Sequence, residues 1–231
     1  MTALRRVTGA GELLDEPGLD DAELAASLGH VAAVNRWLGG ARALRRAFRP
    51  LLRDALRVLD VGTGSGDLPI ALARYARAHE CAITITAAEL HPQTRALAER
   101  RCAPFPEIRV RAADALALPW PEDSFDVAIF SLVLHHLEDD AARVALREAA
   151  RVAPVVIINE LHRTRANYAG ARLLGATLWR RNRITRHDGP LSVLRAYRPA
   201  ELAALVASAG LRVREVRRRW FYRVVLVATR A

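Results

Sequence analysis

Short runs of branched apolar residues alternate with longer amphipathic stretches through the middle of the chain. Such runs favour strands buried on both faces, and the stretches between them favour helices. The predicted strands lie at residues 55–62, 82–90, 107–114, 124–133 and 154–161, and the predicted helices between them at 68–79, 92–101 and 139–151. Strands that alternate with helices at this spacing form βαβ units, which predicts a parallel sheet with helices on both faces.

The two ends of the chain follow other patterns. Residues 20–38 and 41–52 predict two helices with no strand beside them, so we expect a helical cap on the sheet. After the fifth strand the rhythm breaks, and the predicted elements are a helix at 166–179, a basic loop at 180–190 and a helix at 199–210. Residues 211–220 and 221–230 then predict two tightly joined strands, an antiparallel pair at the end of the sheet.

The composition is that of a packed globular protein. The 231 residues are 52% hydrophobic and 26% charged, which excludes disordered, collagen-like and disulfide-stapled classes. The two cysteines, Cys81 and Cys102, fit a reducing compartment, and neither has a Cys/His cluster close by in the sequence, so we expect no metal site. Residues 1–12 show no secretory signal, and no window approaches ~18 apolar residues, which predicts a cytoplasmic protein without a membrane span.

Charge is unevenly distributed along the chain. The net charge is +10, and all 35 basic residues are arginines. Residues 161–231 hold 16 arginines and three acids, whereas the first 160 residues hold 19 arginines and 22 acids. A codon bias explains the missing lysine but not the asymmetry. The basic third could face an anionic substrate, a carrier, nucleic acid or a lipid surface in peripheral contact.

The strongest local motif is a glycine-rich turn, VLDVGTGSG, between the first strand and the first helix of the sheet. Gly62 and Gly64 allow a tight turn with bare backbone against a ligand, and Gly66 allows close packing of the helix. The G-x-G-x-G spacing is neither that of dinucleotide-binding loops nor that of phosphate loops, which also need a lysine. The loop therefore predicts a ligand other than a triphosphate.

Two acids end the next two predicted strands, Glu89 the second and Asp114 the third. Ligands of open α/β sheets bind at the carboxyl ends of the strands. There, Glu89 could accept hydrogen bonds from both hydroxyls of a ribose, and Asp114 could accept one from an adenine amino group. The alternative is that the glycines form a plain turn and the acids are solvated strand ends.

Three segments resemble the class I S-adenosylmethionine-dependent methyltransferases, in the small-molecule group of types 11 and 12: VLDVGTGSGDLP, AAELHP and AADALALPWPEDSFDVAIFSLVLHHLED. The resemblance runs from about residue 56 to residue 153. It implies an α/β fold with a Rossmann-like, doubly wound sheet of about seven strands, mostly parallel with an antiparallel C-terminal strand. The expected organisation is a helical cap at 1–52 and a methyltransferase domain at 53–231, with a substrate-specificity insertion at about 162–198, together one structural domain.

The resemblance also implies a cofactor, S-adenosyl-L-methionine, with S-adenosyl-L-homocysteine as the product. Its methionine part would lie on Asp60 and the glycine loop, its ribose on Glu89, its adenine between Leu90, Asp114 and Ala115, and its sulfonium beside Ser131. The expected cofactor residues are Arg36, Asp60, Gly62, Thr63, Gly64, Gly66, Glu89, Leu90, Asp114, Ala115, Ser131 and His136.

Methyl transfer requires alignment of the nucleophile and exclusion of water, and needs a base only where the nucleophile must lose a proton. The candidate bases are His135, after the fourth strand, and His187, which Asp188 could orient. His135 could instead cap a helix or contact the cofactor, and His187-Asp188 could form a plain turn. The expected substrate residues are Trp37, His162, Tyr168 and Asp188.

The segments VNRWLGG and NRITRHDGPLSVLRAYRPAELAALVASAGL resemble a bacterial subgroup linked to polyketide or quinone-like natural products. The leading prediction is therefore O-methylation of a phenolic or enolic hydroxyl on a small hydrophobic or aromatic substrate. The alternatives are C-methylation of a quinone-like ring, methylation of nucleic acid, and a non-catalytic cofactor-binding subunit. Nucleic acid is disfavoured because residues 131–134 read Ser-Leu-Val-Leu where base-methylating enzymes commonly carry Asn/Asp-Pro-Pro-Tyr/Phe. The sequence predicts no particular homo-oligomer.

Overall fold

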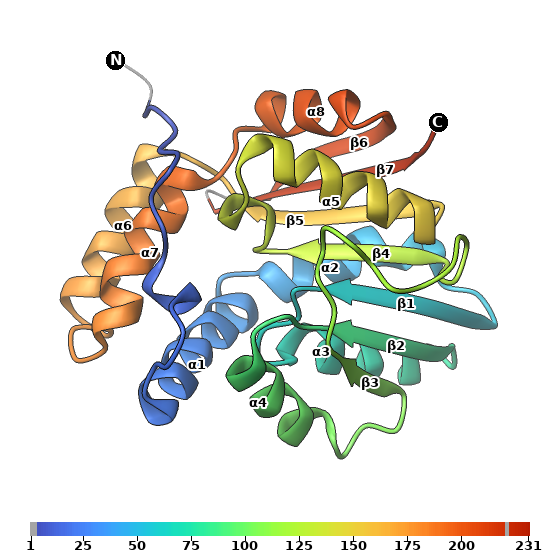
Figure 1. The fold of residues 1–231 in the computed structure, drawn as a ribbon, viewed down its shortest axis with the longest axis horizontal. Coiled ribbons are helices and arrows are strands. Elements are labelled where there is room, and N and C mark those ends of the chain that lie inside the picture. Colours follow the sequence, from blue (N-terminus) through green and yellow to red (C-terminus); the bar gives the residue numbers. More distant parts are fainter. Residues whose placement is uncertain (1–3, 220–221) are drawn as a thin grey trace.

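The computed structural model describes residues 4–219 and 222–231, and its centre is a seven-stranded sheet (Figure 1). Its strands are β1 (Ala55–Val61), β2 (Ala82–Ala88), β3 (Ile108–Arg111), β4 (Val127–Ser131), β5 (Val155–Leu161), β6 (Leu211–Arg219) and β7 (Arg223–Arg230). The order across the sheet is β3-β2-β1-β4-β5-β7-β6. β1 to β5 are parallel, and β7 runs antiparallel between β5 and β6. The predicted mixed sheet is confirmed; Trp220 and Phe221, within the two predicted C-terminal strands, lie outside the described residues.

Helices cover both faces of the sheet, which explains the unbroken apolar runs of its strands. One face packs against α2 (Gly40–Phe48) and α3 (Asp67–Arg77), and the other against α5 (Asp139–Val152) and α8 (Pro199–Ser208). In β1, Val58 points to the first face and Leu59 to the second, and both side chains are fully buried. α4 (Pro92–Cys102) follows β2, and short 3-10 helices lie at Leu13–Asp15, Arg49–Leu51 and Leu134–His136.

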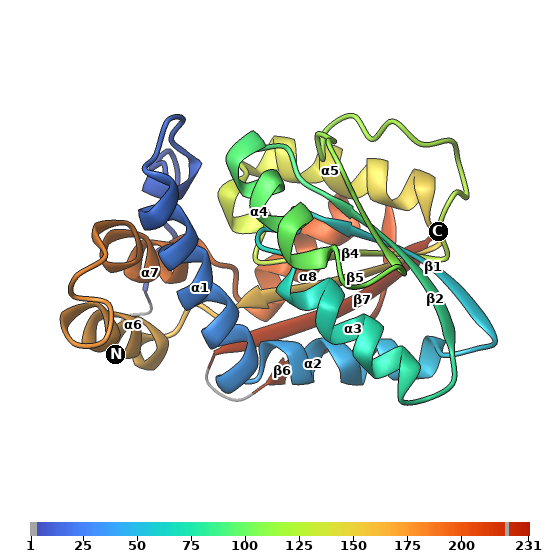
Figure 2. The same ribbon diagram turned by 90° about the horizontal axis from the view of Figure 1, so that it is seen from below.

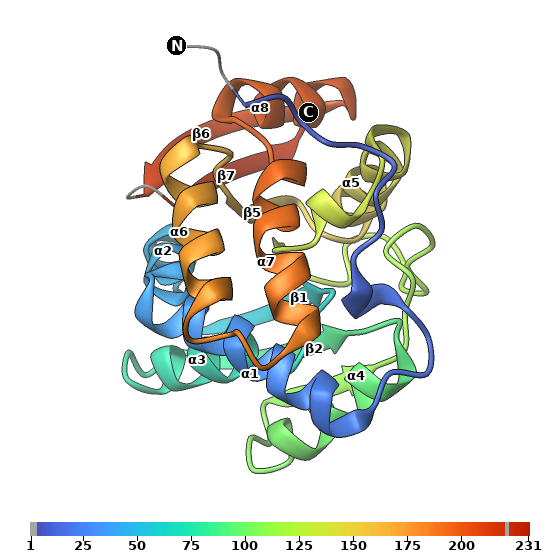
Figure 3. The ribbon, with the colours of Figure 1, turned by 90° about the vertical axis from the view of Figure 1, so that its left-hand side faces the viewer.

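Three further helices form a cap beyond the carboxyl ends of the strands: α1 (Asp21–Trp37), α6 (Arg165–Ala176) and α7 (Arg183–Arg195) (Figure 2). Asp20 caps α1 by accepting a 2.9 Å hydrogen bond from Glu23 N, and Gly39, with φ of 87°, ends it. The N-terminal segment, which precedes α1, lies along α7 (Figure 3). Of the two N-terminal helices, only α1 belongs to this cap, because α2 packs on β5 and β7.

The basic loop predicted at 180–190 is wrong, since most of it belongs to α7. Asn182 begins the helix by accepting a 2.7 Å hydrogen bond from Thr185 N, and Ile184 and Val193 are buried. Gly189-Pro190 favours a turn locally, but the packing of α7 on α6 and α1 overrides it and keeps Pro190 inside the helix.

Two smaller features bear on the site. β3 ends at Arg111, so Asp114 does not end the strand as predicted but lies in the following loop, where it bridges Ala117. Among the described residues, no helix is long and apolar enough to cross a membrane.

Candidate functional site

A cavity of about 540 Å³ lies at the carboxyl ends of β1, β2 and β4, beneath the cap helices α1, α6 and α7. Its volume is within the range of small-molecule sites. The glycine loop forms one part of its lining, and residues 131–133 and 135–137 form another. Apolar side chains complete it, among them Leu28 and Val34 of α1, Leu174 of α6, and Trp179 in the connection between α6 and α7. The cavity thus has a polar side at the sheet edge and an apolar side beneath the cap.

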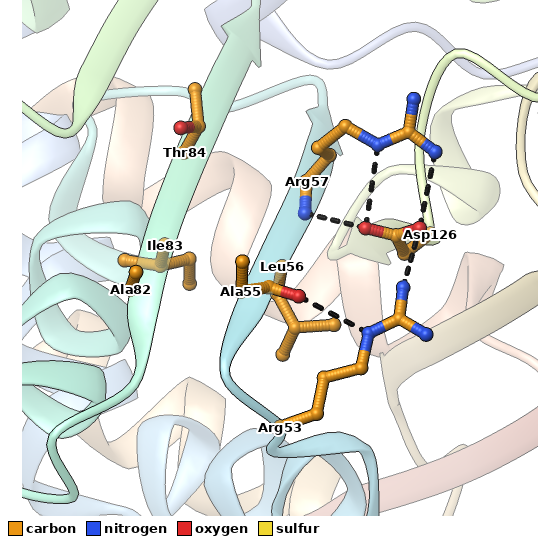
Figure 4. A pocket seen from close by; sticks show the side chains of 8 residues that line it. All are labelled: Arg53, Ala55, Leu56, Arg57, Ala82, Ile83, Thr84 and Asp126. Carbon is orange, nitrogen blue, oxygen red and sulfur yellow. Dashed lines mark hydrogen bonds and ion pairs between the residues drawn. The ribbon is translucent and has the colours of Figure 1, made fainter.

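A second hollow lies at the opposite, amino ends of β1 and β2 (Figure 4). Its charged groups already satisfy one another, because Asp126 pairs with Arg53 at 2.6 Å and with Arg57 at 3.1 Å. Asp126 also accepts a 2.7 Å hydrogen bond from Arg57 N. We therefore take the cavity at the carboxyl ends as the candidate site.

The glycine loop has a backbone that side chains rarely adopt. Gly62 and Gly64 have φ of 68° and 57°. A Cβ at Gly62 would lie 2.6 Å from Val133 Cγ2, whereas within the described chain a Cβ at Gly64 would meet only Leu28 Cδ2, at 3.9 Å. Gly64 therefore faces open cavity. Gly66 does not line the cavity: a Cβ there would lie 2.5 Å from Cys102 Sγ, so this glycine allows the start of α3 to lie close to Cys102 at the end of α4.

Three carboxylates surround this loop. Glu89 accepts hydrogen bonds from Gly64 N at 2.9 Å and from His91 N at 3.0 Å, and burial raises its pKa. Asp67 accepts one from Asn35 Nδ2 at 3.0 Å. Burial, with the charges of Asp67 and Glu89, raises the pKa of Asp60 to about 7. Together they make this end of the cavity favourable for a cationic ligand.

These residues fit S-adenosylmethionine, which carries an ammonium and a sulfonium. Gly64 leaves space beside the loop for a ligand, and the acids match the positive charges. Ser65 Oγ is buried without a hydrogen-bond partner among the described residues. Ser65 and Asp67 line the cavity, although the sequence analysis did not single them out. Ser65 lies inside the glycine motif and Asp67 directly follows it. Both could therefore have been predicted from their positions in the sequence.

The cavity brings together ten of the twelve expected cofactor residues: Asp60, Gly62, Thr63, Gly64, Glu89, Leu90, Asp114, Ala115, Ser131 and His136. Besides Gly66, the exception is Arg36. It is exposed and lies with its guanidinium 4.8 Å from the ring centre of Trp37, itself 74% exposed. Contact of the ten with the cofactor stays a prediction.

Of the expected substrate residues, Asp188 lines the cavity, whereas Trp37, His162 and Tyr168 do not. His187 is also outside: its ring is 50% exposed, and its Nδ1 lies 2.7 Å from Asp188 Oδ1. The reason is α7, because adjacent residues of a helix point in different directions. The predicted loop would have allowed both residues to face the pocket.

His135 lies in the cavity lining and is 2% exposed. Its Nδ1 is 2.7 Å from Oε2 of Glu160, a buried residue at the end of β5. The other oxygen, Oε1, accepts hydrogen bonds from Val133 N and Leu134 N. Although burial opposes it, the charge of His135 and its hydrogen bond hold the pKa of Glu160 below its usual range.

His136 has carboxylates on both sides of its ring. Its Nδ1 is 2.8 Å from Asp15 Oδ2, and its Nε2 is 3.7 Å from Oε2 of Glu12. Burial favours the neutral ring, but Glu12 and Asp15 outweigh it and raise the pKa of His136 to about 9. Neither acid, nor Glu160, is among the site residues predicted from the sequence. The sequence contained a signal for Glu160, because it is a further acid near the end of a predicted strand. It contained no such signal for Glu12 or Asp15.

Comparisons with known proteins agree with a methyltransferase domain and with this fold. Residues 58–154 match the family model of a methyltransferase domain. A ubiquinone/menaquinone biosynthesis C-methyltransferase of Rickettsia massiliae is 32% identical over 98 residues, which are 41% of this chain and 39% of that protein. The chain thus spans well under two thirds of the length of this curated relative.

Two solved structures have the same fold. A SAM-dependent methyltransferase from Aquifex aeolicus superposes with a TM-score of 0.67 at 18% identity, covering 92% of this chain and 100% of that one. The cyclase SpnF superposes with a TM-score of 0.60 at 18% identity, covering 82% and 80%. At this identity the likeness concerns the fold, which hosts more than one reaction.

Proposed function

We propose that this chain, whose residues 58–154 are a methyltransferase domain of the S-adenosylmethionine-dependent class, methylates a small apolar molecule at an ionisable hydroxyl. The observation that carries the proposal is the shared cavity. Gly64 and Glu89 line it together with His135 and the apolar side chains of the cap. The leading reaction is O-methylation of a phenol or enol.

Bound S-adenosylmethionine supplies a methyl group that its sulfonium already activates. The protein has three further tasks, each assigned to residues of the cavity. The glycine loop and its acids bind the cationic end of the cofactor, and the cap helices exclude water from the cavity. His135, held by Glu160 through Nδ1, acts in the ionisation of the substrate hydroxyl, which makes its oxygen a nucleophile.

C-methylation of a quinone-like ring is the second candidate, because the Rickettsia relative is named a C-methyltransferase. The same site supports it, since an ionised phenol is nucleophilic at ring carbons as well as at oxygen. The substrate's position against the methyl group then decides which atom reacts.

Turnover of S-adenosylmethionine labelled in its methyl group tests the proposal. Phenols, enols, quinols and single- and double-stranded RNA are offered in parallel, and NMR of the product locates the methyl. We expect methylated phenols or enols. Tight binding of S-adenosylhomocysteine without any turnover would instead indicate a non-catalytic subunit, and methylated RNA would overturn the small-molecule assignment.

We expect His135→Ala to lower turnover by about 10²–10⁴-fold, because a positioned ionising group is lost. Cofactor affinity, measured by calorimetry, should change little, and the loss in turnover should shrink as the pH rises and the substrate ionises unaided. His187→Ala is the matched control, since that ring lies outside the cavity, and it should keep the parent rate. Equal losses in both variants would contradict the assignment.

We expect Glu89→Ala to weaken S-adenosylhomocysteine binding by about 1.5–3 kcal/mol, the range for hydrogen bonds to a charged acceptor. The loop should also loosen, because Gly64 N and His91 N lose their acceptor. Calorimetric titration gives the affinity, and Glu99→Ala, on the exposed side of α4, is the control. Parent-like affinity in Glu89→Ala would show that this acid does not hold the ribose.

A further inference from the structure

Three side chains at the edge of the cavity point toward one another from distant parts of the chain. Glu12 comes from the N-terminal segment, and His135 and His136 from the 3-10 helix after β4. One ligand atom of each lies within 4.8 Å of the other two. The Nε2 atom of His135 is 3.7 Å from Oε1 of Glu12, and that of His136 is 3.7 Å from Oε2. These separations are too long for hydrogen bonds.

Each imidazole is oriented by a carboxylate of its own. Glu160 Oε2 lies 2.7 Å from Nδ1 of His135, and Asp15 Oδ2 lies 2.8 Å from Nδ1 of His136. A proton on each Nδ1 leaves the lone pair of each Nε2 directed at Glu12. Metal-binding histidines almost always have such a carboxylate or carbonyl behind them, which fixes the tautomer and the ring orientation.

Two of the carboxylates beside the rings, Glu12 and Glu160, are buried, whereas Asp15 is half exposed. Glu12 is 4% exposed and accepts hydrogen bonds from Ser192 Oγ at 3.0 Å. With Asp15 and Glu160, it places three carboxylates against the two rings. The guanidinium of Arg195 lies beside them, with Nε donating to His135 O at 2.7 Å. Without a metal, protons on the rings supply part of the balancing charge. When both imidazoles are neutral, as metal ligation requires, the three carboxylates outnumber Arg195 and leave an excess of negative charge that one divalent cation would balance.

We propose that Nε2 of His135, Nε2 of His136 and the carboxylate of Glu12 bind one divalent first-row transition metal, of the Fe²⁺, Co²⁺, Ni²⁺ or Zn²⁺ kind. Two imidazoles and one carboxylate on one side of an ion form a ligand set that suits these metals, whereas Mg²⁺ and Ca²⁺ prefer oxygen ligands alone. The sequence predicted no metal site, because Glu12 lies far from the histidine pair along the chain.

The three ligands leave coordination positions open toward the cavity, since all three residues line it. A substrate hydroxyl that binds at such a position would have a lower pKa, as metal-bound water does, and would release its proton to solvent as it binds. The inference deepens the proposed function and rests on it for this role, because it names the group that ionises the substrate. Metal binding itself is independent of methyl transfer.

The test uses the full chain, treated with EDTA and then titrated with Co²⁺, whose visible absorption reports imidazole and carboxylate ligands. We expect one Co²⁺ per chain, displaced by Zn²⁺ and not by Mg²⁺. Glu12→Gln and His136→Gln, which change little in size, should abolish the absorption. Asp15→Asn should weaken Co²⁺ binding by about 10–100-fold, as loss of an orienting carboxylate does. His79→Ala, an exposed histidine outside the cavity, is the control and should bind as the parent does.

Absence of Co²⁺ absorption in the parent chain would overturn the inference, and so would parent-like binding in Glu12→Gln. Circular dichroism of each variant separates loss of metal from loss of fold. Bound Co²⁺ should also raise the melting temperature of the parent but not of Glu12→Gln, by mass action. The two proposals fail separately: metal binding without methyl transfer sinks only the proposed function, and methyl transfer by a chain that binds no metal sinks only this inference.

Discussion

We expect Gly64→Leu to weaken S-adenosylhomocysteine binding by at least about 100-fold, or 2.7 kcal/mol, while the chain stays folded. Gly64 has φ of 57°, and its Cβ direction opens into the cavity with Leu28 Cδ2 at 3.9 Å. A leucine side chain would therefore fill the space that the ligand needs. Calorimetric titration of purified variants with S-adenosylhomocysteine measures the effect.

The control is Gly210→Leu, because Gly210 has φ of 87° and, its two chain neighbours aside, no heavy atom of the described chain lies within 4 Å of its Cβ position. Both substitutions place a side chain in the left-handed region, at a cost of about 1–2 kcal/mol in folding free energy. Only Gly64 lines the cavity, so only its variant should lose the ligand. If Gly64→Leu keeps the parent affinity, the glycine loop does not bind the cofactor.

Much of the fold could be predicted from the sequence because its strands are buried on both faces. Continuous apolar runs such as that of β4, in which every residue is buried, are strong evidence for a parallel sheet. The glycine motif was equally informative, since the positive φ of Gly62 and Gly64 is a local requirement that few other residues meet. Features set by the local chain were thus read correctly.

The prediction was wrong where packing overrides the local chain. Gly189-Pro190 is a turn pattern, yet α7 continues through it because side chains on both sides of the pattern, Ile184 and Val193, are buried by packing. This one error also misplaced His187, which α7 turns away from the cavity. The sequence pattern of residues 180–190 does not contain the tertiary packing that decides between a turn and a helix there.

The candidate site divides in the same way. His135 was found because it follows a strand at the edge where ligands bind. Its partner across the pocket, Glu12, approaches from the N-terminal segment, and this approach depends on tertiary contacts such as those of Leu13 N and Leu14 N with the Asp188 carboxylate, each at 2.9 Å. The sheet edge at which ligands bind can be predicted from where the strands end in the sequence, whereas the groups that approach it from distant segments cannot.

Glu160→Gln should lower the free energy of unfolding by about 3–5 kcal/mol, the cost of breaking a buried pair by removing one partner. Oε1 of Glu160 accepts from Val133 N at 2.9 Å and Leu134 N at 2.8 Å, and Oε2 faces His135 Nδ1 at 2.7 Å. A glutamine keeps one acceptor oxygen. Its amide NH₂ group then faces either the two backbone N–H donors or the imidazole N–H. Because the residue is fully buried, that donor has no water to bond to.

Urea denaturation of Glu160→Gln and of Glu122→Gln measures the difference. Glu122 is the matched acid, since its pair with Arg230 is exposed, and its loss should cost less than about 0.5 kcal/mol. Val133 also links stability to binding, because its side chain is the neighbour that a Cβ at Gly62 would strike at 2.6 Å. Loosening Val133 should therefore weaken S-adenosylhomocysteine binding as well. If Glu160→Gln matches Glu122→Gln in stability, the carboxylate beneath the histidine is not what holds the loop after β4 in place.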